Sequence, residues 1–470
     1  MKVVLINQCY DCYSEIGLGL GLLYLTSFLE KNNHEVSIVS FYNNKYEELF
    51  NQIEKINPKI IGLNILTEKA ILTYKLIKIL KKHFNKIKII LGGEHISAVP
   101  KEALINGCDY VITGEIEEEF LRLISNLQKE LLHSETISKK IKKRSTTNKK
   151  LITNINTMPF PAAYKDIKRK TSFIIGSRGC PYTCYFCSKN VFGQSIRFRS
   201  PRNVFEEIKM HYYKFGIKDF RFYDDCFTLN RNQVIKICEL IIKHKLEITW
   251  WCNTRIDLID EETILMIKKA GCRMINFGIE SGSKKTLETI NKRINLDQVI
   301  PKLKLIKKYQ LQSSVNFIFG FPWEKKQDIK ETWSFIKQIS PYVEFIGATI
   351  FLPRPGTKIY KQLRKEVGYW WNKKIVFQTL KDVIVFDTSR LRYNLFPLDE
   401  KVLFEMKKIF KYIQKFNMRK LNLLSRINIY LWSYLSSFSF KMNPLFEKNY
   451  IQKAYRLYNS MIKRIKTTFL

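Results

Sequence analysis

With 45% hydrophobic side chains, the chain is globular and not disordered. Its 470 residues are too many for a single hydrophobic core and predict two or three domains. Its formal net charge is +37, but Lys outnumbers Arg about three to one, which indicates a compositional bias more than a nucleic-acid surface. We therefore expect no nucleic acid among the partners, and an RNA- or membrane-associated protein stays as the alternative class.

The N-terminus and the cysteines favour a cytoplasmic protein. The opening sequence MKVVLINQCY has no cleavage site and predicts a buried strand rather than a signal peptide. Ten cysteines in a chain without an export signal indicate metal binding or catalysis more than disulfides. No apolar run reaches the length of a membrane-spanning helix, so that any membrane contact would be peripheral.

Residues 1–132 alternate between short apolar runs and helical patterns, which predicts an α/β domain with a doubly wound, flavodoxin-like parallel sheet. Ligands of such sheets bind at the carboxyl ends of the strands. The predicted strands are 2–7, 35–41, 59–66, 86–93 and 110–114. The predicted helices are 19–33, 46–57, 70–84, 99–108 and 117–131.

A basic, proline-containing linker is expected over residues 133–165. The alternation then resumes over residues 166–365, where six strands separated by helices predict a partial (β/α)6 barrel. The predicted strands are 172–177, 219–224, 248–255, 274–279, 314–319 and 344–352. Residues 366–470 read as a helical and basic C-terminal region.

Three cysteines, Cys180, Cys184 and Cys187, follow the first predicted barrel strand within the sequence GSRGCPYTCYFCSKN. A structural zinc site normally has four ligands and a disulfide has two, so three cysteines suit a metal centre with one open position. This loop on a partial barrel resembles the radical S-adenosylmethionine (SAM) family, with a zinc site as the alternative. The resemblance implies a [4Fe–4S] cluster on the three thiolates, and an open iron that binds SAM for reductive cleavage to a 5′-deoxyadenosyl radical.

The resemblance continues along the later strands and implies contacts of SAM with Phe186, Asp224, Asp225, Arg255, Glu280 and Gly320. Phe186 would pack near the adenine, and either aspartate would bind the SAM amino group, with a helix cap as the alternative. Arg255 would pair with the SAM carboxylate through its planar fork, with a surface ion pair as the alternative. Glu280 would meet the ribose hydroxyls, Gly320 would let the backbone approach the adenine, and Glu324 would hold the turn.

The N-terminal domain resembles the cobalamin-binding domain of B12-dependent radical SAM proteins. The residues implied at the cobalamin are Thr67, Gly92, Gly93, Glu94, His95, Gly114 and Glu115. The chain lacks the Asp-x-His-x-x-Gly pattern, so the cobalamin is expected base-off without a histidine ligand, and His95 is expected to be a hydrogen-bonding loop residue. Ile116 stands where the family pattern has glycine, and a retained domain with an empty site is the alternative.

The sequence therefore predicts a cobalamin-dependent radical SAM enzyme, most commonly a methyltransferase that acts on an unactivated carbon or phosphorus. Cyclisation, ring contraction or oxidation with the same cofactors is the alternative chemistry. The expected partners are a small-molecule, lipid or natural-product substrate and an electron donor such as flavodoxin or ferredoxin. Two features stay open: Cys9 and Cys12 could form a second redox site, and residues 419–441 could form an interfacial helix or a cap on the barrel.

Overall fold

The computed structural model describes residues 1–9, 19–42, 45–132, 145–147, 151–162, 171–368 and 399–419. These residues form two compact units. The first unit contains residues 1–279, 284–313 and 352–368, and the second contains residues 280–283, 314–351 and 399–419. None of the described helices is long and apolar enough to cross a lipid bilayer.

The N-terminal part of the first unit contains a six-stranded parallel sheet with the order β2-β1-β3-β4-β5-β6. Its first five strands have the flavodoxin-like order, as predicted, so the chain changes direction across the sheet between β1 and β3. The strands are β1 (Lys2–Cys9), β2 (Glu35–Tyr42), β3 (Ile60–Asn64), β4 (Lys88–Gly92), β5 (Tyr110–Thr113) and β6 (Ser145–Thr147). Strand β6 was not predicted and lies within the expected linker.

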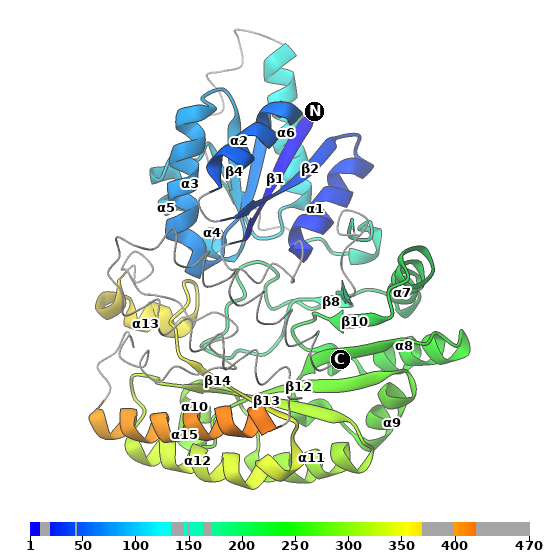
Figure 1. Ribbon diagram of the computed structural model, residues 1–470, viewed down its shortest axis with the longest axis vertical. Coiled ribbons are helices and arrows are strands. Elements are labelled where there is room, and N and C mark those ends of the chain that lie inside the picture. Colours follow the sequence, from blue (N-terminus) through cyan, green and yellow to red (C-terminus); the bar gives the residue numbers. More distant parts are fainter. Residues whose placement is uncertain are drawn as a thin grey trace, which may run out of the picture. The chain divides into compact units, whose positions relative to one another are not determined.

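Helices cover both faces of this sheet, with α1 and α6 on one side and α3 and α5 on the other (Figure 1). Leu25 and Leu29 of α1 and Phe120 of α6 share one buried apolar cluster with Leu5 and Ile60 of the sheet. The helices are α1 (Leu20–Lys31), α2 (Tyr46–Ile56), α3 (Ala70–His83), α4 (Glu94–Ala98), α5 (Pro100–Ile105) and α6 (Glu117–Leu132). The predicted cobalamin residues follow strands β3, β4 and β5 at the carboxyl ends of the sheet.

The barrel part of the first unit has four parallel strands in the order β7-β10-β11-β12. These are β7 (Thr171–Ile174), β10 (Asp219–Phe222), β11 (Thr249–Thr254) and β12 (Cys272–Glu280). Residues with alternating burial give the sheet two different faces: Phe220, Phe222 and Trp250 are buried, whereas their neighbours Arg221 and Trp251 are only partly buried. Helices of this part are α7 (Pro201–Phe215), α8 (Arg231–Lys243), α9 (Glu261–Lys269), α10 (Lys284–Thr289), α11 (Val299–Lys308) and α13 (Lys358–Val367).

A short antiparallel pair closes the loop that carries the three cysteines. Strand β8 (Ser177–Arg178) pairs with β9 (Arg197–Phe198), so that the intervening residues 179–196 form a loop with a fixed base. These two-residue strands have no periodic signal in the sequence and were not predicted.

The second unit contains the parallel pair β13 (Gln312–Phe319) and β14 (Phe345–Ile350), with the helices α12 (Lys326–Ile339) and α15 (Glu400–Arg419). Helix α15 runs beside α12 (Figure 1), and Tyr412 contacts Trp333 with ring centroids 4.8 Å apart. Asn417 of α15 accepts a hydrogen bond from the Ile346 amide at 3.0 Å and donates one to its carbonyl at 2.8 Å. The possible interfacial helix at 419–441 lies outside the described residues apart from Arg419.

Candidate active site

The cysteine loop begins with a glycine that no other residue can replace without strain. Gly179 has a φ of +91°, and a Cβ atom at this position would lie 2.5 Å from the Ser195 carbonyl oxygen. The loop then turns back on itself, because the Cys180 amide donates to Gly193 at 3.4 Å and the Lys189 ammonium donates to the Cys180 carbonyl at 2.8 Å. The first cysteine is therefore held at the base of the loop.

The protein around the loop disfavours the thiolate forms of Cys180 and Cys187, although Cys187 lies at the surface. Desolvation raises the pKa of Cys180, and it raises the pKa of Cys187 to about 12, with Asp225 and Cys184 adding to the shift. The thiols thus influence one another, although no three Cys, His, Asp or Glu side chains of the described residues form an assembled metal site. Three soft donors on one loop fit an iron–sulfur cluster chemically, since binding displaces the thiol protons.

Other segments of the first unit anchor the outer side of this loop. The Tyr185 amide donates to the Ile290 carbonyl at 2.9 Å, and the Ile359 amide donates to the Tyr185 carbonyl at 3.2 Å. Asn190 donates to the Pro355 carbonyl at 2.9 Å. Phe186 lies next to Lys292, whose ammonium is 5.9 Å from the ring centroid. The loop is therefore supported from residues 290–292 and from the turn before α13.

The two neighbouring aspartates have different surroundings. Asp224 is 3% exposed and accepts hydrogen bonds from Ser177 Oγ at 2.5 Å and the Gly176 amide at 2.9 Å. Burial raises the pKa of Asp224 to about 6, and burial also raises that of Asp225, which Lys189 opposes. The helix-cap alternative is wrong for both, because Asn230 caps α8. Asp224 binds the residues that follow β7, whereas the charge of Asp225 acts on Cys187 of the cysteine loop.

Arg255 is buried rather than a surface ion-pair residue, with 5% exposure. It stacks on Tyr182, with 3.9 Å between Cζ and the ring centroid, and it pairs with Asp257 at 2.9 Å. It also donates to the carbonyls of Lys292 at 3.0 Å and Arg293 at 3.1 Å. These bonds use four of the five guanidinium N–H groups, so that one remains for a ligand. Its pairing with the SAM carboxylate stays a prediction.

The predicted residues Glu280 and Gly320 belong to the second unit. Glu280 ends β12 with a φ of +74°, which is a strained conformation for a non-glycine residue and is typical of functional sites. Gly320 has a φ of +84°. Glu324 holds this turn as expected, because one of its carboxylate oxygens accepts from the amides of Gly320 at 2.7 Å and Phe321 at 3.0 Å. The roles of Glu280 and Gly320 toward SAM stay predictions.

The predicted cobalamin residues include a histidine that is engaged within the protein. His95 is fully buried, its Nδ1 lies 3.2 Å from Thr67 Oγ1, and its Nε2 lies 3.7 Å from the Glu102 carboxylate. Gly93 has a φ of +104°, and a Cβ atom there would lie 1.9 Å from the Asn64 side-chain oxygen. His95 is engaged in hydrogen bonding as expected, but it lies on the short helix α4 and not in a loop.

A narrow apolar cavity lies beside one glycine of β3 and one of β4. Gly62 and Gly92 line it together with Ile116, Leu5 and Phe120. A Cβ atom on Gly92 would lie 3.2 Å from Ile116 Cγ2, so that Ile116 occupies part of the space that Gly92 leaves. The Gly114 amide donates a hydrogen bond to Ser97 Oγ at 2.9 Å. The side chains of Leu5, Ile116 and Phe120 therefore lie directly against the two glycines of the cavity.

Glu94 contributes to a charged link with the turn before α13. Arg354 lies 3.8 Å from Glu94 and 2.5 Å from Glu68, so the loops after β3 and β4 share one cation. Cys9 ends β1, whereas Cys12 lies outside the described residues. The second redox site suggested for Cys9 and Cys12 therefore stays a prediction.

A buried ionic cluster connects the cobalamin-side loop to the cysteine loop, and the sequence did not predict it. Glu115 accepts from Arg178 at 3.1 Å and from Arg197 at 2.6 Å, and Glu117 accepts from Arg178 at 2.8 Å. Arg178 belongs to β8 and Arg197 to β9, the two strands that close the cysteine loop. The Ile152 amide also donates to Glu115 at 2.7 Å. Glu115, expected at the cobalamin, thus fixes the base of the cysteine loop.

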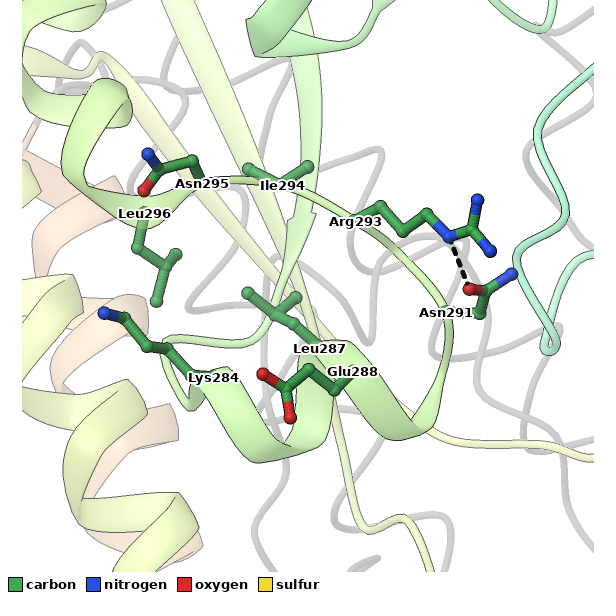
Figure 2. A pocket seen from close by; sticks show the side chains of 8 residues that line it. All are labelled: Lys284, Leu287, Glu288, Asn291, Arg293, Ile294, Asn295 and Leu296. Carbon is green, nitrogen blue, oxygen red and sulfur yellow. Dashed lines mark hydrogen bonds between the residues drawn. The ribbon is translucent and has the colours of Figure 1, made fainter.

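An open pocket of about 310 Å³ lies around the turn after α10 (Figure 2). Its lining residues are Lys284, Leu287, Glu288, Asn291, Arg293, Ile294, Asn295 and Leu296. Asn291 accepts from Arg293 at 2.8 Å and donates to the Thr183 carbonyl at 2.8 Å. The pocket wall therefore supports the cysteine loop, but none of the predicted site residues lines it.

Comparisons with known proteins agree with this architecture. The chain matches the family models of the B12 binding domain over residues 11–124 and of the radical SAM superfamily over residues 174–336. An uncharacterized methyltransferase from Pyrococcus horikoshii is 33% identical over 362 residues, which cover 73% of this chain and 78% of the relative. An anaerobic magnesium-protoporphyrin IX monomethyl ester cyclase from Rubrivivax gelatinosus is 23% identical, over 76% of this chain and 68% of the relative.

Among solved structures, the radical S-adenosylmethionine methyltransferase TsrM from Kitasatospora setae, bound to tryptophan and a SAM analogue, shares the fold. The TM-score is 0.62 at 16% identity, and the match covers 77% of this chain and 76% of that chain. The family models, the relatives and the fold together lead to one assignment. The chain is a radical SAM enzyme and belongs to the B12-binding-domain-containing members of that superfamily.

Proposed function

We propose that this enzyme is a cobalamin-dependent methyltransferase that transfers a methyl group from SAM to an unactivated carbon or phosphorus of a small molecule. The observation that carries the proposal is the buried contact between Glu115 of the B12-binding domain and Arg178 at the base of the cysteine loop. Methyl transfer with two cofactors requires that both are held near one substrate, and this contact fixes the two cofactor loops to each other.

Cys180, Cys184 and Cys187 would hold the [4Fe–4S] cluster, and residues 64–67, 92–95 and 114–116 would hold the cobalamin. When bound, the cluster supplies the electron that cleaves SAM, and the cobalamin carries the methyl group. Asp225 would bind the SAM amino group, because Asp224 is occupied by Ser177 and Gly176. Arg255 would offer its remaining N–H to the SAM carboxylate, with Asp257 and Tyr182 fixing the orientation of the guanidinium.

Cobalamin would bind without a histidine ligand. The observation in favour is that His95 of α4 is buried against Thr67 and Glu102 and therefore has a structural role within the domain. The electron paramagnetic resonance spectrum of the Co(II) form should lack nitrogen superhyperfine splitting from a lower axial ligand. A spectrum that contains this splitting would contradict the proposal.

The proposed reaction also needs an electron donor and a substrate. The required electron would come from a reduced flavodoxin or ferredoxin, and the substrate would be a small natural product or lipid. The second candidate chemistry is cyclisation or oxidation, which the similarity to a cyclase from Rubrivivax gelatinosus favours. The two chemistries differ in their products from SAM, because methyl transfer also yields S-adenosylhomocysteine.

The proposal is tested by anaerobic reconstitution of the full chain with iron, sulfide, cobalamin and SAM. The wild type should bind about four irons at the barrel and form 5′-deoxyadenosine under reduction. Changing Cys180, Cys184 and Cys187 together to Ala should abolish both, whereas Cys238→Ala, a buried thiol on α8, should retain both. Reductive SAM cleavage by the triple variant would overturn the cluster assignment. Formation of 5′-deoxyadenosine without S-adenosylhomocysteine would favour the cyclase-type chemistry.

A further inference from the structure

We propose that Arg221, on the face of the barrel sheet opposite α7, binds a carboxylate of the substrate, and that the substrate has a flat apolar body beside this carboxylate. The inference rests on the proposed function, since it places a substrate group in the barrel of a radical SAM enzyme. The juxtaposition that carries it is a guanidinium between two aromatic rings that has no acidic partner in the described part of the chain.

The strand register places these side chains in one row. Arg221 of β10 is in register with Phe173 of β7 and with Trp251 of β11, and Trp251 is in register with Met274 of β12. Residues in register on parallel strands point to the same face of a sheet. The opposite face carries Phe220 and Trp250, which are fully buried, and Phe220 contacts His211 of α7, so the row of Arg221 lies on the face away from α7.

The aromatic rings hold the guanidinium in place but do not neutralise it. The Arg221 Cζ lies 5.6 Å from the centroid of the Phe173 ring and 5.0 Å from that of the Trp251 ring. Its Nε is buried and has no hydrogen-bond partner among the described residues. A cation between two rings keeps its planar fork free for a bidentate oxyanion, which is the geometry that arginine prefers.

Arg221 differs from comparable arginines because it has no acidic partner among the residues that the structure describes. Every other arginine in the described part of the first unit that is not exposed forms an ion pair with Asp or Glu; these are Arg178, Arg197, Arg199, Arg231, Arg255 and Arg354. The nearest acidic residue along the same face of β10, Asp219, instead binds Thr171, Thr249 and Arg273. A partly buried cation without a protein partner is costly unless a ligand provides the anion.

The surroundings of Arg221 define the ligand further. Phe173, Trp251 and Met274 offer flat and polarisable apolar surface on both sides of the cation. Nearer the carboxyl end of the strands, Asn276 donates to Asn253 at 3.2 Å, and Tyr223 is 55% exposed. Two residues along a strand span roughly 7 Å, so a carboxylate at Arg221 lies at least that far from a reacting atom near the strand ends. A single guanidinium matches one negative charge, which favours a carboxylate over a phosphate monoester.

The test is calorimetric binding of three probes to the reconstituted full-length protein with SAM: 2-naphthoate, its neutral analogue 2-naphthamide, and 2-naphthyl phosphate. The wild type should bind the carboxylate about tenfold more tightly than the amide, because a charge-assisted bidentate hydrogen bond is lost in the amide. Arg221→Gln should remove this preference. Arg221→Lys should retain a weaker preference, because it keeps the charge but loses the planar fork.

The matched control is Arg273→Gln, which removes an exposed arginine of β12 that pairs with Asp219. This variant should keep the carboxylate preference of the wild type. Four outcomes would overturn the inference. In the wild type these are equal binding of carboxylate and amide, no binding of any probe, and tighter binding of the phosphate. In Arg221→Gln it is a carboxylate preference that survives. Iron content and SAM cleavage are measured on the same preparations, so a failure of the proposed function is recognised separately from a failure of carboxylate binding.

Discussion

Arg178 and Glu115 form a buried ion pair across 63 positions of the chain, with 3.1 Å between Nη1 and Oε1. Both side chains are almost fully excluded from solvent, and Glu115 also binds Arg197. The pair joins a loop after β5 to the base of the cysteine loop. Charges with so little access to water depend on each other, because neither can be solvated when its partner is removed.

We therefore expect Glu115→Gln to destabilise the protein by about 3–5 kcal/mol, the usual cost of leaving a buried charge without its partner. The matched control is Glu119→Gln on α6, which removes a carboxylate from the exposed Arg122, and which should cost at most about 1 kcal/mol. Urea unfolding followed by circular dichroism measures both. Equal and small shifts for the two variants would show that the buried pair is not a stabilising link.

Gly179→Ala is expected to abolish iron binding, because the added Cβ would collide with the Ser195 carbonyl oxygen at 2.5 Å and open the base of the cysteine loop. Gly216→Ala is the control, since Gly216 also has a positive φ, of +64°, but has no atom within 4 Å of the added Cβ. That variant should lose about 1 kcal/mol of stability and keep its iron. The measurement is the iron content of both variants after anaerobic reconstitution. Full iron retention by Gly179→Ala would contradict the role of this turn.

Arg255→Gln and Asp257→Asn distinguish a SAM-binding arginine from a structural one. If Arg255 offers its remaining N–H to SAM, the first variant should weaken SAM binding about tenfold or more, because a charge-assisted bond is lost. Asp257→Asn should have a smaller effect, since it keeps the cation and only loosens its orientation. Calorimetric titration with SAM provides both dissociation constants. Identical losses in the two variants would mean that Arg255 acts through the ordering of residues 292 and 293.

The stability of the protein should fall with rising pH because of Glu324. Burial raises the pKa of this carboxyl to about 8 from a model-compound value of 4.5, with the bonds from Gly320 and Phe321 opposing the shift. Between these two values the unfolded chain ionises while the folded chain stays neutral, so unfolding becomes more favourable as pH rises, and the loss is complete above pH 8. The slope from one such group is at most about 1.4 kcal/mol per pH unit.

Urea midpoints between pH 5 and pH 9 test this expectation. Glu324→Gln should remove the pH-dependent decline in this interval, because the amide can accept the same backbone hydrogen bonds without ionising. Glu331→Gln is the control, since it removes an exposed carboxylate from the same helix region and should follow the wild-type curve. Superimposable curves for the wild type and Glu324→Gln would contradict the assignment.

The regular part of the fold could be predicted from the sequence because hydrophobic periodicity reports it directly. The flavodoxin-like strand order and the barrel strands agree with the expected segments. The three-residue strand β6 and the two-residue strands β8 and β9 were missed, since elements this short contain no period. Of the site, the cysteine motif was readable from spacing alone.

The rest of the site depends on contacts between distant residues that a sequence does not display. Arg197 and Glu115 are 82 positions apart, and nothing in either local sequence indicates that the two charges meet. The same limit applies to Asp224 and Asp225, whose adjacent positions gave no reason to separate their roles. Only the hydrogen bonds of Asp224 with Gly176 and Ser177 distinguish the two.

The side chain of Asn417 has a consequence for the order in which the protein can mature during synthesis. It gives Ile346 the donor and the acceptor that a neighbouring strand would otherwise provide. Because these residues are 71 positions apart, a ribosome needs roughly 4–14 s to translate from one to the other at typical speeds. Throughout that interval the edge of β14 lacks its own cover and can pair with another nascent chain. Helix α15 therefore covers this strand edge only late in synthesis, and a chaperone that binds the nascent chain would shield the edge until then.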